Sequence, residues 1–331
     1  MNKLTQFLYK QWYQQAKPSK LLRMCSAVYS LLQQRQCLKK QASHFPIPVI
    51  VVGNLTVGGT GKTPTVIALY EYFMAKGLRA AIVTRGYKNK LQHFPHQVGA
   101  EDTAATIGDE ALLMYQKTKA PIWLAKKRRQ ALEAIQQSEQ IDIIISDDGL
   151  QHYAMPRAIE CVLIDGTHGF GNGYCLPAGP LREDISRLKT VDFIIINGQC
   201  SPALKKTLSA YLHHCHYMQL DSAEIYPLNP NHPPFQKHQH SLAAFAGIGH
   251  PDRFFTSLSN DDIRFTPYPF EDHHHFVKKD FDIPETCIIM TEKDAVKCHG
   301  LTDKVIYVLP VKAHLPELFW HKLHLQLSTI L

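Results

Sequence analysis

Short apolar runs alternate with stretches of helical periodicity along most of the chain. After the first run, apolar residues from Val66 to Met74 recur at helical spacing until Gly77. Strands that are apolar throughout, with helices between them, are typical of a parallel sheet covered on both faces. We therefore predict an α/β fold built on a mostly parallel sheet flanked by helices. The strands are expected at 47–52, 80–83, 121–124, 141–145, 161–165 and 193–197.

A second and smaller α/β unit is predicted near the C-terminal end. The stretch from 226 to 240 is polar and rich in proline and histidine, which is typical of a boundary or a long insertion. We place the division near Ser222. Beyond it, strand and helix are expected to alternate through 242–246, 254–258, 263–265, 287–290 and 305–309. The predicted units are a larger domain at 46–222 and a smaller domain at 223–331 that closes a cleft.

The first 45 residues form a leader with its own pattern. Between Leu21 and Leu38 apolar residues recur at helical spacing, with basic and amide side chains mostly between them, which predicts an amphipathic helix. Polar residues such as Arg23 interrupt the apolar positions, so a helix that spans a bilayer is not expected. Upstream lie aromatic residues that favour the headgroup level of a membrane. The alternative is that the helix packs on the protein's own core. The aromatic positions are Phe7, Tyr9, Trp12 and Tyr13.

Charge favours the membrane reading of the leader. The chain of 331 residues has a formal charge of +7, from 36 basic and 29 acidic residues. Eight of the basic residues lie in 1–45, where no acidic residue occurs, so the remainder is nearly neutral. A basic leader on a neutral body indicates an anionic lipid surface rather than nucleic acid, and no obligatory protein partner is evident. The eight cysteines are scattered without a C-x-x-C pair, which fits a reduced cytosol.

A glycine-rich loop follows the first predicted strand directly and leads into the first predicted helix. Its sequence T-x-G-G-x-G-K-T departs from the usual G-x-x-x-x-G-K-[ST] only at Thr56. Backbone N–H groups of such a loop cradle phosphates, Lys62 can neutralise the β- and γ-oxygens, and the Thr63 hydroxyl can bind Mg²⁺. We therefore predict a site for a nucleoside triphosphate. The residues expected to contact the nucleotide are Thr56, Val57, Gly58, Gly59, Thr60, Gly61, Lys62 and Thr63.

Two adjacent aspartates follow the fourth predicted strand. Asp147 and Asp148 stand where a Walker B carboxylate holds Mg²⁺ or its water, at the carboxyl end of a buried strand. The alternative is a pair of aspartates that caps a loop. Two neighbouring carboxylates at a strand end are costly unless a cation meets them, so the pattern favours the metal site. The predicted cofactors are a nucleoside triphosphate and Mg²⁺.

Several further strings occur together with the loop and the aspartate pair. They are T-R-G-Y at 84–87, G-D-E at 108–110, D-D-G-L-Q-H at 147–152, F-G-N-G-Y-C-L-P-A-G-P-L-R-E at 170–183, A-G-I-G-H-P-D-R-F at 246–254 and M-T-E-K-D-A-V-K-C at 290–298. In this order the strings closely resemble the tetraacyldisaccharide 4'-kinases, the lipid A 4'-kinases of Gram-negative bacteria. The resemblance implies transfer of phosphate from ATP to the 4'-hydroxyl of a tetraacyldisaccharide 1-phosphate, at the cytoplasmic face of the inner membrane.

The resemblance also implies catalytic roles. Asp109 of the G-D-E string is expected to be the general base, with Glu110 supporting Mg²⁺; without the resemblance, both are ordinary acids at a helix N-terminus. We predict that His273, oriented by Asp272, pairs with Asp109 across the cleft. Three adjacent histidines do not favour a zinc site, because neighbouring side chains diverge. The M-T-E-K-D string faintly resembles the base-reading motif of P-loop GTPases, and a structural turn is at least as good an interpretation.

An acidic donor and a lipid phosphate both need polar partners. The arginines that follow the second and third strands and the arginine of L-P-A-G-P-L-R-E are candidates for them, as are two polar residues after the aspartate pair. The predicted substrate contacts are Arg85, Arg128, Gln151, His152 and Arg182. The rival functions are a P-loop GTPase switch or metallochaperone, which predicts guanine preference, and a membrane scaffold that binds nucleotide without turnover.

Overall fold

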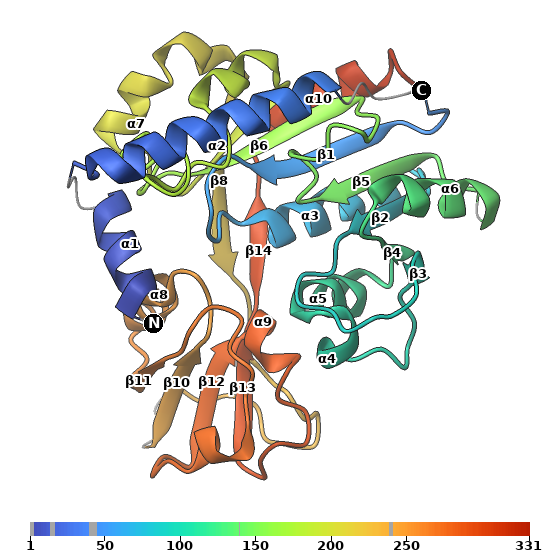
Figure 1. Cartoon of the computed structure of the whole chain (residues 1–331). Coiled ribbons are helices and arrows are strands. Elements are labelled where there is room, and N and C mark those ends of the chain that lie inside the picture. Colours follow the sequence, from blue (N-terminus) through green and yellow to red (C-terminus); the bar gives the residue numbers. More distant parts are fainter. Residues whose placement is uncertain (1–2, 14–16, 40–44, 139, 238–240) are drawn as a thin grey trace.

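The fold is described here from a computed structural model. It describes all residues except 1–2, 14–16, 40–44, 139 and 238–240. Of the leader's basic residues, Lys40 lies outside the described residues, as do the side chains of Lys3 and Lys39. The described chain forms two lobes, each built on its own sheet (Figure 1).

The larger sheet has nine strands in the order β14-β8-β7-β6-β1-β5-β2-β4-β3. Its neighbours pair in parallel except at the two edges, where β14 and β3 run antiparallel to β8 and β4. The predicted α/β fold with a mostly parallel sheet is therefore confirmed. The strands in chain order are β1 (Val49–Asn54), β2 (Ala80–Thr84), β3 (His96–Gln97), β4 (Ile122–Leu124), β5 (Ile143–Asp147), β6 (Ile159–Asp165), β7 (Phe193–Asn197), β8 (Cys215–Ser222) and β14 (Val311–His314).

Helices cover both faces of this sheet, which explains why its strands are apolar throughout. In β1, Ile50 and Val52 pack on the face covered by α3, while Val49 and Val51 pack on the opposite face with α6. Each face therefore has its own buried core. The helical elements of this region are α3 (Lys62–Ala75), α4 (Ala104–Ile107), α5 (Asp109–Thr118), α6 (Arg128–Ser138), α7 (Pro202–Thr207), η1 (Ile185–Thr190) and η2 (Ser209–His214).

The smaller sheet has five strands in the order β11-β10-β12-β13-β9. Phe245 of β10 is fully buried and contacts the rings of Phe270, Phe276 and Phe281, which form much of the core on one face. The elements are β9 (Tyr226–Pro227), β10 (Leu242–Ala246), α8 (Pro251–Asn260), β11 (Thr266–Pro269), η3 (Lys278–Phe281), β12 (Cys287–Thr291), α9 (Glu292–Ala295) and β13 (Val305–Leu309). We call residues 226–309 the small lobe and the rest of the body the large lobe.

The end of the chain returns to the large lobe. Strand β14 pairs with β8, and α10 (Glu317–Leu327) buries Phe319, Leu323 and Leu327 in the core beside α3. The unit expected at 223–331 therefore differs from the small lobe at its C-terminal end. The physical reason is that a strand and a helix have the same local pattern whichever sheet they join.

The leader forms two helices that lie against the large lobe. In α1 (Lys3–Tyr13), the Trp12 Nε1–H donates to the carbonyl of Pro177 at 3.0 Å. In α2 (Lys20–Lys39), the hydroxyls of Ser26 and Tyr29 donate to carbonyls of the body. Among the described residues, no helix combines the length and the apolar character needed to cross a bilayer.

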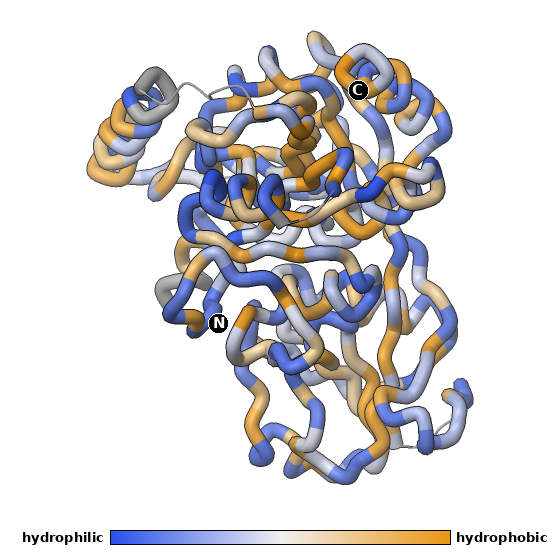
Figure 2. The backbone as a smooth tube through the Cα atoms, turned by 90° about the vertical axis from the view of Figure 1, so that its right-hand side faces the viewer, coloured by the Kyte–Doolittle hydropathy of each residue, from blue (hydrophilic) through white to orange (hydrophobic). Residues whose placement is uncertain are grey.

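The other face of α2 carries apolar side chains that the protein does not cover. Figure 2 shows these orange positions on α2 at the margin of the molecule, away from both sheets. The leader was expected either to lie on a membrane or to pack on the protein's own core, and the two interpretations apply to different faces. Its polar and aromatic residues contact the body, whereas its apolar stripe points outward. The stripe consists of Leu21, Met24, Val28, Leu31 and Leu32, each more than half exposed.

Candidate active site

The glycine-rich loop connects the end of β1 to the start of α3, as predicted. Gly61 is the N-cap of α3 and has a φ of 92°, a left-handed conformation that an L side chain rarely adopts. The loop is held by distant parts of the large lobe, because the Val57 N–H donates to the Pro180 carbonyl at 2.9 Å and the Asn197 amide donates to the Thr60 carbonyl at 3.1 Å. The cradle is therefore fixed by the protein itself.

Lys62 and Thr63 begin α3, and Lys62 faces the end of β5. The Lys62 Nζ lies 3.6 Å from Asp148 Oδ1 and donates to Asn54 Oδ1 at 3.4 Å. Thr63 lies in the first turn of the same helix, where free N–H groups and the helix dipole favour an anion. A cation, a hydroxyl and a helix N-terminus thus meet at one end of the central strand.

Asp147 and Asp148 differ sharply although they are adjacent. Burial, together with the nearby carboxylates of Glu110 and Asp148, raises the pKa of Asp147 to about 7. Burial also opposes ionisation of Asp148, but Lys62 and Arg182 outweigh it and hold the pKa of that carboxyl at about 2. Asp148 has a φ of 46°, a strained conformation of the kind found at functional sites.

The residues predicted to hold a divalent cation fit that role chemically. Asp147 Oδ2 accepts a hydrogen bond from Thr84 at 3.0 Å, whereas its buried Oδ1 has no hydrogen-bond partner among the described residues. Glu110 lies close enough to raise the pKa of Asp147. Thr63, which follows Lys62 in the motif, offers a hydroxyl. An unfilled oxygen among carboxylates and a hydroxyl is a donor set that Mg²⁺ prefers.

Asp109 stands at the N-terminus of α5 and is almost fully buried. Gly108 precedes it with a φ of 90°, and a Cβ at that position would meet the Tyr87 carbonyl at 2.5 Å, so the G-D-E string needs its glycine. Burial opposes ionisation of Asp109, but the hydrogen bond from His273 and the charges of Lys293 and Lys297 hold its pKa below the ordinary value. Asp109 is therefore a carboxylate at neutral pH.

The structure brings His273 of the small lobe onto Asp109 of the large lobe. His273 Nδ1 lies 2.9 Å from Asp109 Oδ2 and 3.1 Å from Oδ1, although 164 residues separate the two in the chain. His273 has a φ of 58°. Asp272, which we expected to orient the ring, lies 3.9 Å from Nε2, beyond hydrogen-bond distance. The geometry thus assigns the orienting contact to Asp109.

Sequence reasoning left Lys293 out of the site, and the structure places it inside. Its Nζ lies 3.0 Å from Glu110 Oε1, 3.3 Å from His273 Nε2 and 3.5 Å from Asp272 Oδ1. Burial works against its charge, but Glu110, Asp272 and Asp109 outweigh it and raise the pKa of Lys293. The M-T-E-K-D string was the available signal, and its likeness to a base-reading motif pointed elsewhere.

Two of the predicted substrate contacts lie together beside Asp148. The Arg182 Nη1 donates to Asp148 Oδ1 at 2.9 Å and to Oδ2 at 3.0 Å. The Gln151 amide donates to Glu183 Oε1 at 2.9 Å, and its oxygen accepts from Arg182 at 3.4 Å. This cluster connects the aspartate pair to the segment around Arg182 and Glu183, which contacts α2 through Tyr29.

The remaining predicted contacts are placed differently from one another. Arg128 is 3% exposed and donates to the carbonyls of Ala125 and Asp147 at 3.1 and 2.9 Å, and burial lowers its pKa to about 10. It therefore joins the ends of β4 and β5 instead of facing solvent. Arg85 is exposed just after β2, and His152 is half-buried after the aspartate pair.

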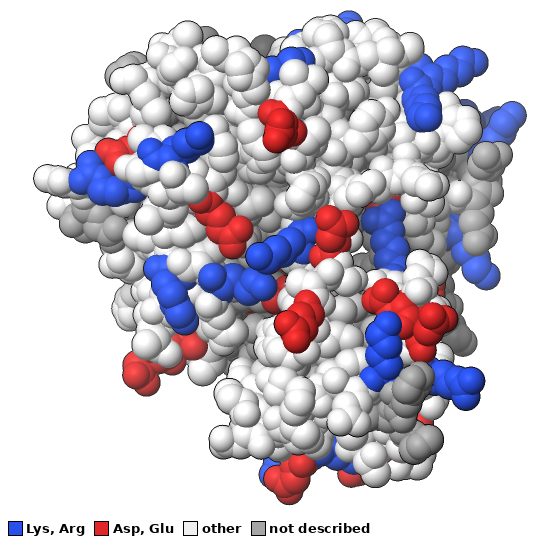
Figure 3. Space-filling view, turned by 180° about the vertical axis from the view of Figure 1, so that it is seen from behind, with Lys and Arg blue, Asp and Glu red and all other residues white. Residues whose placement is uncertain are grey.

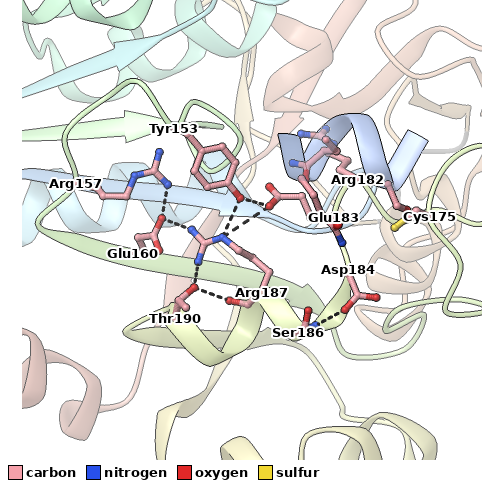
Figure 4. Close-up of a pocket in the computed structure, with 13 residues that line it drawn as sticks. Tyr153, Arg157, Glu160, Cys175, Arg182, Glu183, Asp184, Ser186, Arg187 and Thr190 are labelled. Carbon is pink, nitrogen blue, oxygen red and sulfur yellow. Dashed lines mark hydrogen bonds and ion pairs between the residues drawn. The ribbon is translucent and has the colours of Figure 1, made fainter. Parts of the chain in front are cut away.

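A pocket of about 620 Å³ lies between α2 and the segment 182–190. Figure 4 shows its wall, where Arg157 and Arg187 both point toward Glu160 and Tyr153 points toward Glu183. Arg182 also lines the pocket, so it faces both this space and Asp148. The opposite side is formed by the α2 residues Ser30, Gln33 and Gln34.

A second polar cluster joins the lobes on the other side of β1. Asp165, at the end of β6, accepts from the Arg253 Nη2 of α8 at 2.9 Å. His168 and His250 stack there with ring centroids 4.6 Å apart, and the Tyr9 hydroxyl of α1 lies 3.0 Å from His168 Nε2. Seen from behind, charged side chains of both signs gather along the boundary between the lobes (Figure 3).

Comparisons with known proteins agree on one family. The family model described as tetraacyldisaccharide-1-P 4'-kinase matches residues 18–328. A tetraacyldisaccharide 4'-kinase of Legionella pneumophila is 47% identical over 276 residues, covering 83% of this chain and 82% of the relative. The enzyme of Alcanivorax borkumensis is 41% identical over 324 residues and 96% of each chain.

A solved structure shares the fold. LpxK from Aquifex aeolicus, crystallised in complex with ATP, has a TM-score of 0.72 and 24% sequence identity, and the match covers 92% of this chain and 96% of that one. At this identity the likeness concerns the fold. Together with the match over 311 of 331 residues from 18 to 328, the relatives above settle the family. The chain belongs to the tetraacyldisaccharide-1-P 4'-kinase family.

Proposed function

We propose that the chain transfers the γ-phosphate of ATP to the 4'-hydroxyl of a tetraacyldisaccharide 1-phosphate, with Asp109 accepting the hydroxyl proton. The observation that carries the proposal is the contact between Asp109 and His273 at 2.9 Å beside the phosphate loop. A buried carboxylate that is ionised at neutral pH can take a proton from an alcohol. Phosphoryl transfer otherwise needs mainly positioning and charge neutralisation, which Lys62 supplies.

Thr63, Glu110, Asp147 and Asp148 are the residues that would hold Mg²⁺. Bound there, the ion supplies charge neutralisation at the phosphate oxygens. The unpartnered Oδ1 of Asp147 and the raised pKa of that carboxyl support the assignment, because a cation held there would pair with that oxygen and favour the ionised carboxylate. Lys62 and Arg182 meanwhile hold Asp148 ionised.

The polar head of the acceptor is proposed to enter the pocket below α2. Arg182 lines this pocket and also contacts Asp148, so a sugar bound there lies next to the phosphate loop. Gln151 belongs to the same cluster and can hydrogen-bond hydroxyl groups once it exchanges its present partners. Arg85 and His152, near the ends of β2 and β5, are the further candidates for substrate contact.

Transfer of labelled phosphate tests the proposed function. Purified protein with Mg²⁺, γ-labelled ATP and detergent-dispersed tetraacyldisaccharide 1-phosphate should label the lipid, whereas γ-labelled GTP should not. An acceptor without the 4'-hydroxyl should remain unlabelled. Lys62→Met should abolish transfer, while Lys76→Met, an exposed lysine at the other end of the same helix, should leave it unchanged. Label released as free phosphate without any on the lipid would contradict the proposal.

The leader is proposed to hold the enzyme at the cytoplasmic face of the inner membrane. The support is the uncovered apolar stripe on α2 together with eight basic and no acidic residues in the first 45. An apolar face beside basic residues binds anionic bilayers. Leu21→Asp should weaken co-sedimentation with vesicles that contain anionic lipid. The matched control is Leu325→Asp on α10, also an exposed leucine, and equal loss in both variants would contradict the assignment.

The rival functions are disfavoured on specific grounds. A GTPase switch or metallochaperone does not account for a match to the kinase family along residues 18–328. A scaffold without turnover does not account for a buried, ionised carboxylate paired with a histidine from the other lobe. A GTPase switch or metallochaperone also does not explain the uncovered apolar stripe on α2.

A further inference from the structure

Lys293 occupies the middle of the junction between the lobes, at a point that the proposed function does not use. It is the second residue of the short helix α9, which follows β12 directly, and the backbone there is fixed because the Thr291 hydroxyl caps that helix. Its ammonium group contacts Glu110 of the large lobe and His273 of the small lobe, at 3.0 and 3.3 Å. The side chain is 19% exposed.

The chemistry of an ammonium group determines what His273 can do. A lysine side chain can only donate hydrogen bonds, so the His273 Nε2 facing it must be the bare, accepting nitrogen. The proton of the neutral ring then lies on Nδ1, which faces Asp109 at 2.9 Å. A second positive charge on the ring is disfavoured, because it would lie 3.3 Å from the ammonium group.

We propose that Lys293 is a positioning residue that holds His273 as the neutral Nδ1–H tautomer, so that His273 donates to Asp109 and leaves that carboxylate as the base. The inference rests on the proposed function, because it concerns how the base of that reaction is kept active. An imidazolium at position 273 would instead bind Asp109 as an ion pair and make it a weaker base. The neutral donor orients Asp109 without that loss.

The other groups around His273 do not take over this role. Asp109 faces Nδ1 from α5 and favours a charged ring, and Asp272 lies 3.9 Å from Nε2 and acts in the same direction. Lys88 faces the backbone carbonyl of His273 at 3.5 Å, and the ring of Tyr87 lies 4.9 Å from the imidazole. Among the described residues that contact the ring, Lys293 therefore supplies the opposing charge.

Lys293→Met removes the ammonium group while keeping much of the side chain's length. Without that positive charge, Asp109 and Asp272 should draw a proton onto His273. We expect phosphate transfer at pH 7 to fall at least about tenfold and to recover toward the wild-type rate near pH 9, since one pH unit corresponds to a tenfold change in protonation. Lys293→Arg should keep most of the activity at pH 7. Lys88→Met is the matched control, because it removes a nearby cation that contacts the His273 carbonyl and the Tyr87 ring instead of the imidazole.

The tautomer is read directly in protein labelled with ¹⁵N at histidine, with the His273 signals identified from their absence in His273→Gln. The wild-type ring should show a bare Nε2 and a protonated Nδ1 at pH 7, and Lys293→Met should show both nitrogens protonated. A uniform loss of transfer at every pH with an unchanged ring would overturn the inference. In that outcome, phosphate transfer by the wild-type protein would still support the proposed function. The role of Lys293 and the proposed function are therefore tested separately.

Discussion

The lobes meet at two junctions that contain the same kinds of residue and use them differently. Asp165 accepts from the backbone N–H groups of Thr167 and His168, both in its own loop, before Arg253 of the small lobe adds a further contact. Asp109 has one such local donor, the N–H of Glu110 at 2.9 Å. Its other partners come from the small lobe. We interpret a carboxylate whose hydrogen-bond donors lie in its own loop as structural. A carboxylate whose donors lie across the cleft keeps them only while the two lobes are closed.

Both carboxylates are ionised, so charge alone does not separate them. Burial opposes ionisation of Asp165, but His168 and Arg253 outweigh it and hold its pKa at about 2. The pKa of Asp109 is also below its ordinary value. The difference is the origin of the donors, since those of Asp109 include His273, a side chain of the small lobe. The comparison predicts that catalysis belongs to the Asp109 junction.

The largest expected effect comes from exchanging the two carboxylates for amides. Asp109→Asn should lower the rate of phosphate transfer by about 10²- to 10⁴-fold, because loss of a general base typically has this effect, while ATP binding measured by calorimetry should persist. Asp165→Asn should instead lower the melting temperature and reduce transfer by less than about tenfold. If Asp165→Asn impaired transfer as strongly as Asp109→Asn, the distinction between the junctions would fail.

A smaller effect is expected from Asp147, a third buried carboxylate. Among the described residues its side chain accepts a hydrogen bond from Thr84 of β2, and none from its own loop or from the small lobe. Its folded-state pKa of about 7 is raised above the unfolded value, so its contribution to stability is full below about pH 4 and is lost as pH rises through 7. Without Mg²⁺ or nucleotide, Asp147→Asn should therefore raise the melting temperature at pH 8 by a few degrees and by less at pH 5, where only part of the contribution has been lost. Calorimetry in a chelating buffer measures this. A variant less stable than wild type at pH 8 would contradict the unfilled-site interpretation.

The smallest effect is expected at the edge of the Asp165 junction. Tyr9→Phe removes one hydrogen bond to His168 and should lower the free energy of unfolding by about 0.5–1.5 kcal/mol, with transfer unchanged. Tyr13→Phe provides the control, because Tyr13 contacts His168 through its ring at 5.0 Å. A fall in transfer for Tyr9→Phe alone would show that this junction also affects catalysis.

Local pattern was sufficient for the parts of the molecule that contact near neighbours in sequence. The continuous apolar run of β1 followed by T-x-G-G-x-G-K-T predicted a strand, a loop and a helix in that order, and the structure has them. The aspartate pair after β5 was likewise placed at a strand end. Periodicity could not show that β14 and α10 return to the large lobe, because their partners lie in distant parts of the chain.

The sequence by itself determined the α/β class, the phosphate loop, the position of the aspartate pair that we propose holds Mg²⁺ and, through its motifs, the kinase family. Only the tertiary structure decided that Arg128 is buried on backbone carbonyls and that Lys293 faces both His273 and Glu110. The reason is physical. Strands, turns and helix ends depend on residues a few positions apart, whereas the charge state of a buried group depends on whatever side chains folding brings within a few ångströms of it.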